Sequence, residues 1–284
     1  MPFRPRRSVL YLPGSNTRAL EKARALAADV LILDLEDAVA PEAKETARRQ
    51  VCEAVRTGFG KRETVVRINP LASEWGEADL AAVAAARPDA VLIPKVGGVC
   101  DIRDVERRLG EAPVAVWAMI ETPRGVLDAG AIAAAGGRLC CLVAGTNDLV
   151  KEMGGRAVTG RANLAAALTA IVLAARANRL MAIDGVFNDI ADAADFAAEC
   201  GQGRDFGFDG KTVIHPSQIE PANQAFAPSP DDVAAARRLI AAFAAPESQG
   251  KGAIRFDGRM VERLHADIAR RTVALADAIA ALGE

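Results

Sequence analysis

The sequence predicts an α/β protein, a (β/α)8 TIM barrel with a C-terminal helical extension. Short runs rich in β-branched residues recur along the chain, and each is followed by turn residues and a helical pattern, as in parallel βαβ units. Eight such runs favour a closed barrel, with an open doubly wound sheet as the alternative. The length of 284 residues suits one barrel of about 250 residues and a tail.

The predicted strands are short apolar runs that stop at turn residues. The first, SVLYL, ends before Pro13 and Gly14, and the fifth, VAVWAMI, ends before Glu121. In chain order we expect strands at Ser8–Leu12, Val30–Leu35, Thr64–Ile68, Ala90–Pro94, Val114–Ile120, Cys140–Ala144, Met181–Val186 and Thr212–Ile214. Helical patterns between them lie at Thr17–Ala28, Pro41–Val55, Glu77–Ala86, Ile102–Leu109, Arg161–Ala177 and Ala191–Cys200.

After the eighth strand the chain continues well beyond what barrel closure needs. Helix-like stretches at Ser217–Phe226 and Asp231–Ala245 flank a proline-rich turn, and a glycine-containing link leads to a last helix from about Met260 to Ala281. We therefore divide the chain into a catalytic barrel, residues 1–228, and a helical extension, residues 229–284. We expect the extension to pack on a neighbouring subunit; packing on its own barrel is the alternative.

Charge and composition exclude several classes of function. Lysine and arginine total 35 against 37 acidic residues, so the sequence predicts neither a nucleic-acid partner nor a membrane surface. The longest apolar stretch, Leu164–Ala177, is shorter than the roughly 20 residues that span a bilayer. Five cysteines without metal-ligand spacing favour reduced thiols, and the start shows no export signal, so we expect a cytoplasmic protein.

Polar side chains follow almost every predicted strand. In a barrel the C-terminal ends of the strands meet on one face, where active sites are built, so we expect these residues to converge there. They are Tyr11, then Asp34, Glu36 and Asp37, then Arg67 and Asn69, then Lys95, Glu121, Asn147 and Asp148, Asp184, and finally His215.

Glu121 and Asp148 end the fifth and sixth strands and are neighbours in the barrel. Two carboxylates alone repel, but a divalent cation between them reverses the effect. Oxygen ligands without histidine or cysteine favour a hard ion, so we predict Mg²⁺, with Mn²⁺ as an alternative. Arg67 would stabilise an anionic intermediate beside it. The structural alternatives are an arginine partner for Glu121 and a purely structural pairing of Arg67 with Glu36.

Lysine residues suggest two further hypotheses. A buried Lys95 with a lowered pKa would form a Schiff base with a keto substrate, as in metal-free aldolases. In the first loop, Pro13 and Gly14 precede a helix that carries Arg18, Lys22 and Arg24, and such a helix start can hold a phosphate. Solvated surface cations are the alternative interpretation of that helix.

With these residues in place, the chain resembles the citrate lyase β-subunit-like family within the HpcH/HpaI aldolase group. The matching stretches are RSVLYLPGS, DLEDAVAPEAK, VVRIN, LIPKV, MIETPRG, AGTNDL and GFDGKTVIHPSQI, which cover essentially the whole chain. The pattern, including DGRMVERLH, looks closest to the malyl-CoA thioesterase branch.

The resemblance implies a modified TIM barrel in trimers or hexamers, with Mg²⁺ held by Glu121 and Asp148. It implies that Arg67 contacts substrate oxygens, and that Glu36 and Asp37 support the metal water. Asn147, at the end of the sixth strand, is a further candidate for substrate binding. The matching CoA contacts are Tyr11, Lys22 and the backbone around Ile214 and His215. At Asn16 the related malyl-CoA lyases carry an arginine, for which Arg18 is the candidate substitute.

The tail departs from the family pattern at one position. Malyl-CoA lyases supply an aspartate from the adjacent subunit through a GxxVD motif, and the matching stretch here, DGRMVERLH, has Glu262. Misplacement by about 1 Å can cost on the order of 100-fold in rate, so the longer side chain bears on the carbon–carbon chemistry. Glu262 is the candidate catalytic base; an exposed glutamate in the first turn of a helix is the alternative.

Together these features predict a Mg²⁺-dependent enzyme for a short 3-hydroxyacyl-CoA such as malyl-CoA. It would act as a lyase, by carbon–carbon cleavage, or as a thioesterase, by hydrolysis. One alternative is a metal-dependent aldolase for free keto or hydroxy acids without CoA. A second is a citrate lyase β-type subunit acting on a citryl thioester, and a third is a barrel that has lost activity.

Overall fold

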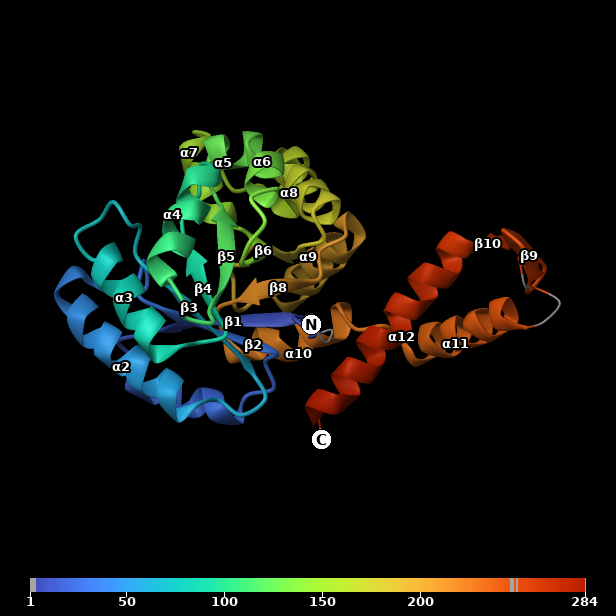
Figure 1. Ribbon diagram of the computed structural model, residues 1–284, viewed down its shortest axis with the longest axis horizontal. Helices are drawn as coiled ribbons and strands as arrows, with labels where there is room; N and C mark the ends of the chain where they lie inside the picture. Colours follow the sequence, from blue (N-terminus) through green and yellow to red (C-terminus); the bar gives the residue numbers. More distant parts are fainter. Residues whose placement is uncertain (1–3, 246–247, 249, 284) are drawn as a thin grey trace. The chain divides into compact units, whose positions relative to one another are not determined.

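The computed structural model describes residues 4–245, 248 and 250–283. Eight parallel strands close into a barrel in chain order, with β8 pairing back to β1, so the predicted fold class is confirmed (Figure 1). The strands are β1 Ser8–Pro13, β2 Val30–Asp34, β3 Glu63–Arg67, β4 Ala90–Ile93, β5 Ala115–Ile120, β6 Leu139–Ala144, β7 Met181–Asp184 and β8 Gly210–Val213. Each predicted strand exists, with ends shifted by one to two residues.

The helices alternate with the strands around the barrel. They are α1 Thr17–Lys22, α2 Lys44–Thr57, α3 Gly76–Ala86, α4 Val99–Leu109, α5 Pro123–Leu127, α6 Ala129–Ala133, α7 Thr146–Glu152, α8 Ala165–Ala177, α9 Ala193–Phe206 and α10 Ile219–Ala225. Short 3-10 turns lie at Ala23–Ala25, Pro41–Ala43, Thr159–Leu164 and Pro216–Gln218. The helix predicted from Arg161 begins at Ala165, because Gly160 and Arg161 have positive φ angles that an α-helix excludes.

The strands bury both of their faces in two apolar layers. On β2, Val30 and Ile32 pack inside the barrel, while Leu31 and Leu33 pack outward in the layer shared with the helices. Side chains alternate along a strand, so Asp34 continues the inward series of β2. The same alternation points the final side chains of several strands into the barrel mouth.

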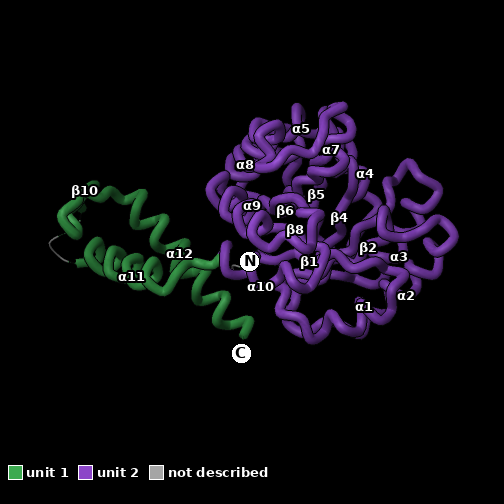
Figure 2. The backbone as a smooth tube through the Cα atoms, turned by 180° about the vertical axis from the view of Figure 1, so that it is seen from behind, with its two compact units in different colours: residues 1–5, 227–284 green, residues 6–226 purple. Residues whose placement is uncertain are grey.

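The chain forms two compact units, residues 6–226 and residues 1–5 with 227–284 (Figure 2). In the second unit, α11 Pro230–Ala244 packs against α12 Arg263–Gly283, and β9 Ala253–Phe256 pairs antiparallel with β10 Arg259–Glu262. The predicted start of the last helix at Met260 is therefore wrong. Asp257 and Gly258 both have positive φ angles and form a tight hairpin turn that places Met260 on a strand.

Within the described residues, no helix is both long and apolar enough to cross a bilayer. The expected packing of the tail on a neighbouring subunit stays a prediction.

Candidate active site at the barrel mouth

A cavity of about 310 Å³ opens at the C-terminal ends of the strands. Seven of the site residues predicted from the sequence line it, namely Tyr11, Asp37, Arg67, Glu121, Asn147, Asp148 and Ile214. Further lining residues include Asp34, Met119, Gly145, Thr146, Asn188 and Thr212. The expected convergence is present for these residues, and it brings the carboxylates of Glu121 and Asp148 to one cavity with the guanidinium of Arg67. Asn69, Lys95, Asp184 and His215, which were expected on the same face, do not line the cavity.

Arg67 ends β3 and lies in register with Asp34 at the end of β2. Its Nε and Nη2 donate to the two carboxylate oxygens of Asp34, each at 2.7 Å. Nη1 lies 3.0 Å from Glu36 Oε2 and 3.6 Å from Asp37 Oδ2. The guanidinium carbon is 4.9 Å from the centre of the Tyr11 ring, a cation–π arrangement. Arg67 is thus oriented by three carboxylates and a ring before any substrate arrives.

The loop that carries Glu36 and Asp37 is held from two sides. The carboxylate of Asp34 accepts hydrogen bonds from the backbone N–H groups of Glu36 (2.9 Å) and Ala38 (3.0 Å). From the other side, the buried Lys44 donates to the carbonyl oxygens of Leu35 (2.8 Å) and Glu36 (2.7 Å). These contacts fix the backbone that presents the two carboxylates to Arg67.

Glu121 follows β5 and is only 2% exposed. Its Oε1 accepts a hydrogen bond from the backbone N–H of Lys95 at 2.7 Å. A Cβ built on Gly145 would lie 2.3 Å from Glu121 Cβ and 2.6 Å from Oε2, so only glycine leaves room for this carboxylate. Burial and repulsion from Glu36 raise the pKa of Glu121 to about 8, against the opposing effects of the Lys95 N–H and Arg67.

Glu36 and Lys95 form a partly buried ion pair, with Nζ 3.4 Å from Oε1. Burial and repulsion from Asp37 raise the pKa of Glu36 to about 7, although Arg67 and Lys95 oppose the shift. Burial alone would lower the pKa of Lys95, but Glu36, Asp37 and Asp148 outweigh it and raise that pKa. A Schiff-base lysine needs the opposite shift, so the ion pair with Glu36 and the neighbouring carboxylates argue against the metal-free route through Lys95.

Asp148 and Asn147 lie in the first turn of α7. Asn147 forms a reciprocal pair of amide hydrogen bonds, at 3.2 and 2.8 Å, with Asn188 from the loop after β7. Asp148 is half-buried and adds to the negative potential that raises the pKa of Glu121. The Asn147–Asn188 pair therefore connects the start of α7, after β6, to the loop after β7 at the cavity.

The donor set at this mouth fits Mg²⁺. Glu121 and Asp148 supply hard oxygen ligands, and buried carboxylates with raised pKa values gain most from a cation. The buried Glu36 Oε2 makes no hydrogen bond of good geometry despite its 3.0 Å approach to Arg67 Nη1. No cluster of three or more His, Cys, Asp or Glu ligands occurs in the described part of the chain. Mg²⁺ matches this pattern because it typically takes one or two protein carboxylates together with water and substrate.

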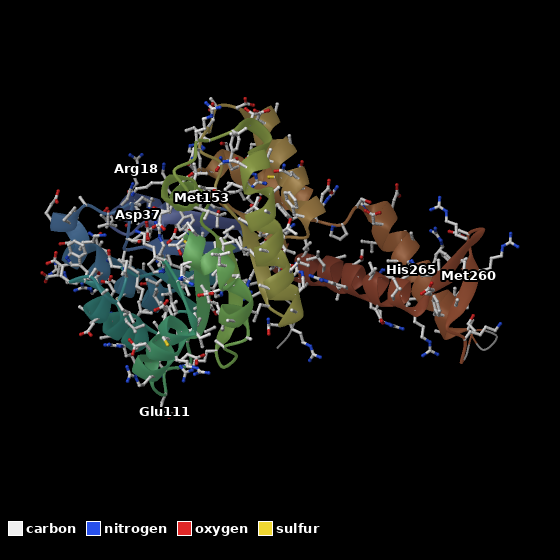
Figure 3. All side chains as sticks on the ribbon, turned by 90° about the horizontal axis from the view of Figure 1, so that it is seen from above. Arg18, Asp37, Glu111, Met153, Met260 and His265 are labelled. Carbon is white, nitrogen blue, oxygen red and sulfur yellow. The ribbon has the colours of Figure 1, made fainter. Side chains whose placement is uncertain are left out.

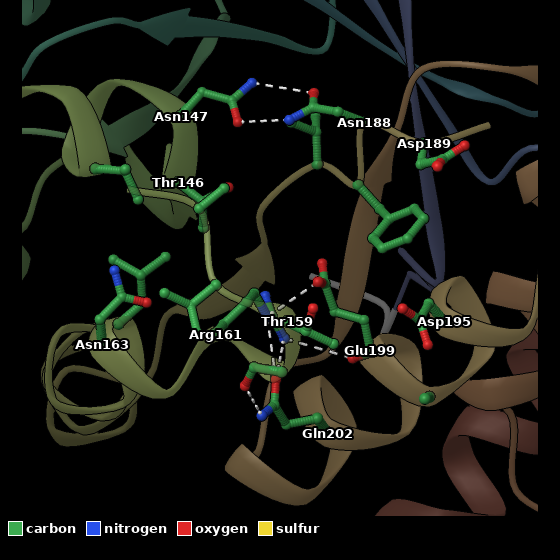
Figure 4. Close-up of a pocket in the computed structure, with 18 residues that line it drawn as sticks. Thr146, Asn147, Thr159, Arg161, Asn163, Asn188, Asp189, Asp195, Glu199 and Gln202 are labelled. Atoms are coloured by element: carbon green, nitrogen blue, oxygen red, sulfur yellow. Dashed lines mark hydrogen bonds and ion pairs between the residues drawn. The ribbon is translucent and has the colours of Figure 1, made fainter. Parts of the chain in front are cut away.

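A second cavity of about 490 Å³ adjoins the first and shares Thr146, Asn147, Val186 and Asn188 with it (Figure 4). Arg161 is the cation of its lining and is already engaged, with Asp184 at 2.7 Å and Glu199 at 3.3 Å. Asp189, Asp195 and Glu199 also line the second cavity, so its lining carries more acidic than basic side chains.

Four of the predicted site residues do not line the first cavity. Glu36 is absent from the lining and contacts it through Arg67, with Oε2 3.0 Å from Nη1. Lys22 is exposed at the end of α1, and His215 is exposed after β8, where its Nδ1 is 2.8 Å from Ser217 Oγ. Glu262 ends β10 in the other compact unit, where it is exposed and its backbone N–H donates to Nδ1 of His265, labelled in Figure 3.

The structure gives three residues a role that the sequence analysis did not assign. Asp34 was expected only to lie on this face of the barrel, without a role of its own. The alternation along β2 and its register with Arg67 are the signals that identify it. Gly145 is identified only by the close approach of Glu121, and Asn188 comes from a loop without periodicity.

Comparison with known proteins matches residues 7–216 to the family described as HpcH/HpaI aldolase/citrate lyase. The chain belongs to this family. Within it, a (3S)-malyl-CoA thioesterase of Cereibacter sphaeroides is 51% identical over 278 residues, which cover 98% of this chain and 96% of the relative. An L-malyl-CoA/beta-methylmalyl-CoA lyase of the same species is 36% identical, covering 92% and 91% of the two chains.

A solved structure has the same fold. It is the protein CitE from Mycobacterium tuberculosis in complex with magnesium, acetoacetate and coenzyme A. The two structures align with a TM-score of 0.78 at 33% identity, covering 96% of this chain and 99% of CitE. The family predicted from the motifs is thus confirmed, and these HpcH/HpaI relatives carry the names of enzymes.

Proposed function

We propose that the protein is a Mg²⁺-dependent enzyme that hydrolyses a short 3-hydroxyacyl-CoA such as malyl-CoA. The observation that carries the proposal is the meeting of Glu121, Asp148 and Arg67 at one cavity in the barrel mouth. An acyl group with a carboxylate and a hydroxyl offers oxygens to a cation and to a guanidinium at once. Burial strengthens both interactions, because a low local dielectric weakens the screening of charge.

Glu121 and Asp148 would hold the metal, and Asn147 would border the acyl group. Bound there, Mg²⁺ would act as a Lewis acid on the substrate oxygens and orient the substrate. Arg67 would present Nη1 to the oxygen on which negative charge develops, as an oxyanion stabiliser does. Glu36 and Asp37, which approach the same nitrogen, would hold the water molecules of the metal shell. Tyr11 and Ile214 line the cavity, whereas Lys22 and His215 are exposed outside it. We propose that these four residues contact CoA.

Hydrolysis and carbon–carbon cleavage share this geometry. Hydrolysis adds water across the thioester bond and yields malate and free CoA, whereas cleavage yields acetyl-CoA and glyoxylate. The higher identity to the thioesterase than to the lyase supports hydrolysis. The proposed base for either reaction is Glu262 from a neighbouring copy in a homotrimer or hexamer, and the exposure of Glu262 on its hairpin supports this assignment.

Product analysis tests the proposal. The purified protein is incubated with malyl-CoA and Mg²⁺, and free CoA and malate are quantified against acetyl-CoA and glyoxylate, with a chelator control. We expect Mg²⁺-dependent release of CoA and malate in equal amounts. Equal amounts of acetyl-CoA and glyoxylate would assign the lyase reaction instead. Absence of both product pairs would reject an action on malyl-CoA.

A further inference from the structure

Asp34 is a buried carboxylate whose two oxygens accept hydrogen bonds from Arg67 and from the loop 35–38. Its side chain is 1% exposed, and an ionised carboxylate at that depth is costly unless its oxygens accept hydrogen bonds. Four hydrogen bonds of 2.7 to 3.0 Å reach it, two from Arg67 and one each from the N–H groups of Glu36 and Ala38. The side chain of Asp34 therefore holds both the guanidinium of Arg67 and the loop that carries Glu36 and Asp37.

The geometry also selects which edge of Arg67 faces the cavity. Asp34 takes Nε and Nη2 as a bidentate pair, and the Tyr11 ring lies against the guanidinium. Rotation of the guanidinium would break both charge-assisted bonds at once, since they share one plane. Nη1 is the guanidinium nitrogen that Asp34 leaves available, and it points to the side where Glu36 and Asp37 lie.

We propose that Asp34 is a positioning residue that fixes the orientation of Arg67 and of the loop 35–38, and so sets the rate of the proposed thioester reaction. Asp34 does not touch the reacting atoms in this role. The rate readout rests on the proposed function, whereas the orientation of Arg67 can be observed without any turnover.

Asp34→Asn tests the role without opening a cavity. Each oxygen of Asp34 accepts one bond from Arg67 and one from a loop N–H group. In asparagine a donor NH2 group replaces one of the two oxygens, so the variant loses one bond to Arg67 and one to the loop and places a donor against two donors. We expect kcat to fall about 100-fold, as for a group misplaced by about 1 Å, while Mg²⁺ affinity stays within threefold of wild type.

Asp29→Asn is the matched control. Asp29 precedes the same strand at the opposite end of the barrel, is 4% exposed, and pairs with Arg7 through two bonds of 2.7 and 2.8 Å. The Asp29→Asn substitution disrupts the same kind of buried bidentate pair, but at the end of the barrel opposite the cavity. We expect kcat per folded molecule to stay at the wild-type value, and an equal fall in both variants would overturn the proposal.

A double-mutant cycle shows whether Asp34 acts through Arg67. In an Arg67→Lys background the guanidinium is already absent, so adding Asp34→Asn should lower kcat by less than about tenfold, because only the contacts to the loop 35–38 remain to be weakened. Losses that multiply, about 100-fold in either background, would overturn the inference.

A crystal structure of Asp34→Asn completes the test. A turned Arg67 guanidinium or a displaced loop 35–38 supports the proposal, and unchanged positions of both overturn it. This readout holds even if the wild-type protein leaves malyl-CoA intact, a result that would reject the proposed function alone.

Discussion

Gly145→Ala is the smallest change that should disable the site. The added Cβ would lie 2.3 Å from Glu121 Cβ, whereas ordinary contacts begin at 3.4 Å. The two residues must therefore separate by about 1 Å, and the Glu121 carboxylate, 2.6 Å from the same Cβ, must move with them. Because Glu121 directly follows the buried strand β5 and is itself buried, its backbone has little room to yield.

The expected loss has two parts. Overpacking of this kind costs about 1–3 kcal/mol of folding stability. Displacement of a proposed metal ligand by about 1 Å should lower Mg²⁺-dependent turnover of malyl-CoA by about 100-fold and weaken Mg²⁺ binding. Thermal denaturation, calorimetric titration with Mg²⁺ and the CoA-release assay measure these effects separately.

Gly201→Ala controls for the change from glycine to alanine. Gly201 lies inside α9 Ala193–Phe206, and a Cβ there meets nothing within 4 Å. Alanine should stabilise that helix by up to about 1 kcal/mol and leave turnover unchanged. A Gly145→Ala protein with wild-type Mg²⁺ affinity and turnover would refute the argument that Glu121 needs this space.

Three further predictions concern charge. The metal-free protein should lose thermal stability as pH rises from about 5 to about 8, because folded Glu36 and Glu121, with pKa values of about 7 and 8, retain protons that the unfolded chain releases near its ordinary value of 4.5. Saturating Mg²⁺ should flatten that profile, and stability that rises with pH in the metal-free protein would contradict the assigned burial. Borohydride treatment with oxaloacetate and a chelator should leave the mass of the protein unchanged, since Lys95 is paired with Glu36 and its pKa is raised; a covalent adduct at Lys95 would restore the Schiff-base route. Glu262→Ala should lower turnover by about 100-fold or more and spare Mg²⁺ binding, as loss of a general base does, and unchanged turnover would reject its role.

The barrel and the cavity-lining residues Arg67, Glu121 and Asp148 could be predicted from the sequence, because the patterns that indicate them lie within short stretches of the chain. Each strand is a short apolar run, and polar residues that follow parallel strands must meet on one face, so Arg67, Glu121 and Asp148 could be placed together. The importance of Asp34 was not predicted, because it depends on strand register and on which residues face inward. That information requires the pairing of β2 with β3, in which Asp34 lies beside Arg67.

The tail shows a second kind of error. Apolar residues at helical spacing suggested a helix from Met260, yet Asp257 and Gly258 between AIRF and RMVE form a tight hairpin turn. An Asp-Gly pair between strand-like runs is a strong hairpin signal that outweighs helical periodicity at the edge of a helix. Spatial relations such as the Asn147–Asn188 pair come from loops and had no sequence signal.

Mg²⁺ titration of the wild-type and Glu121→Gln proteins tests the central claim most directly. The claim is that Glu121 and Asp148 form a metal site at the barrel mouth. Calorimetry should detect one Mg²⁺ site per wild-type chain and a loss of that site in the variant, because glutamine keeps the shape and removes the charge. Equal Mg²⁺ affinity in the two proteins would contradict the claim.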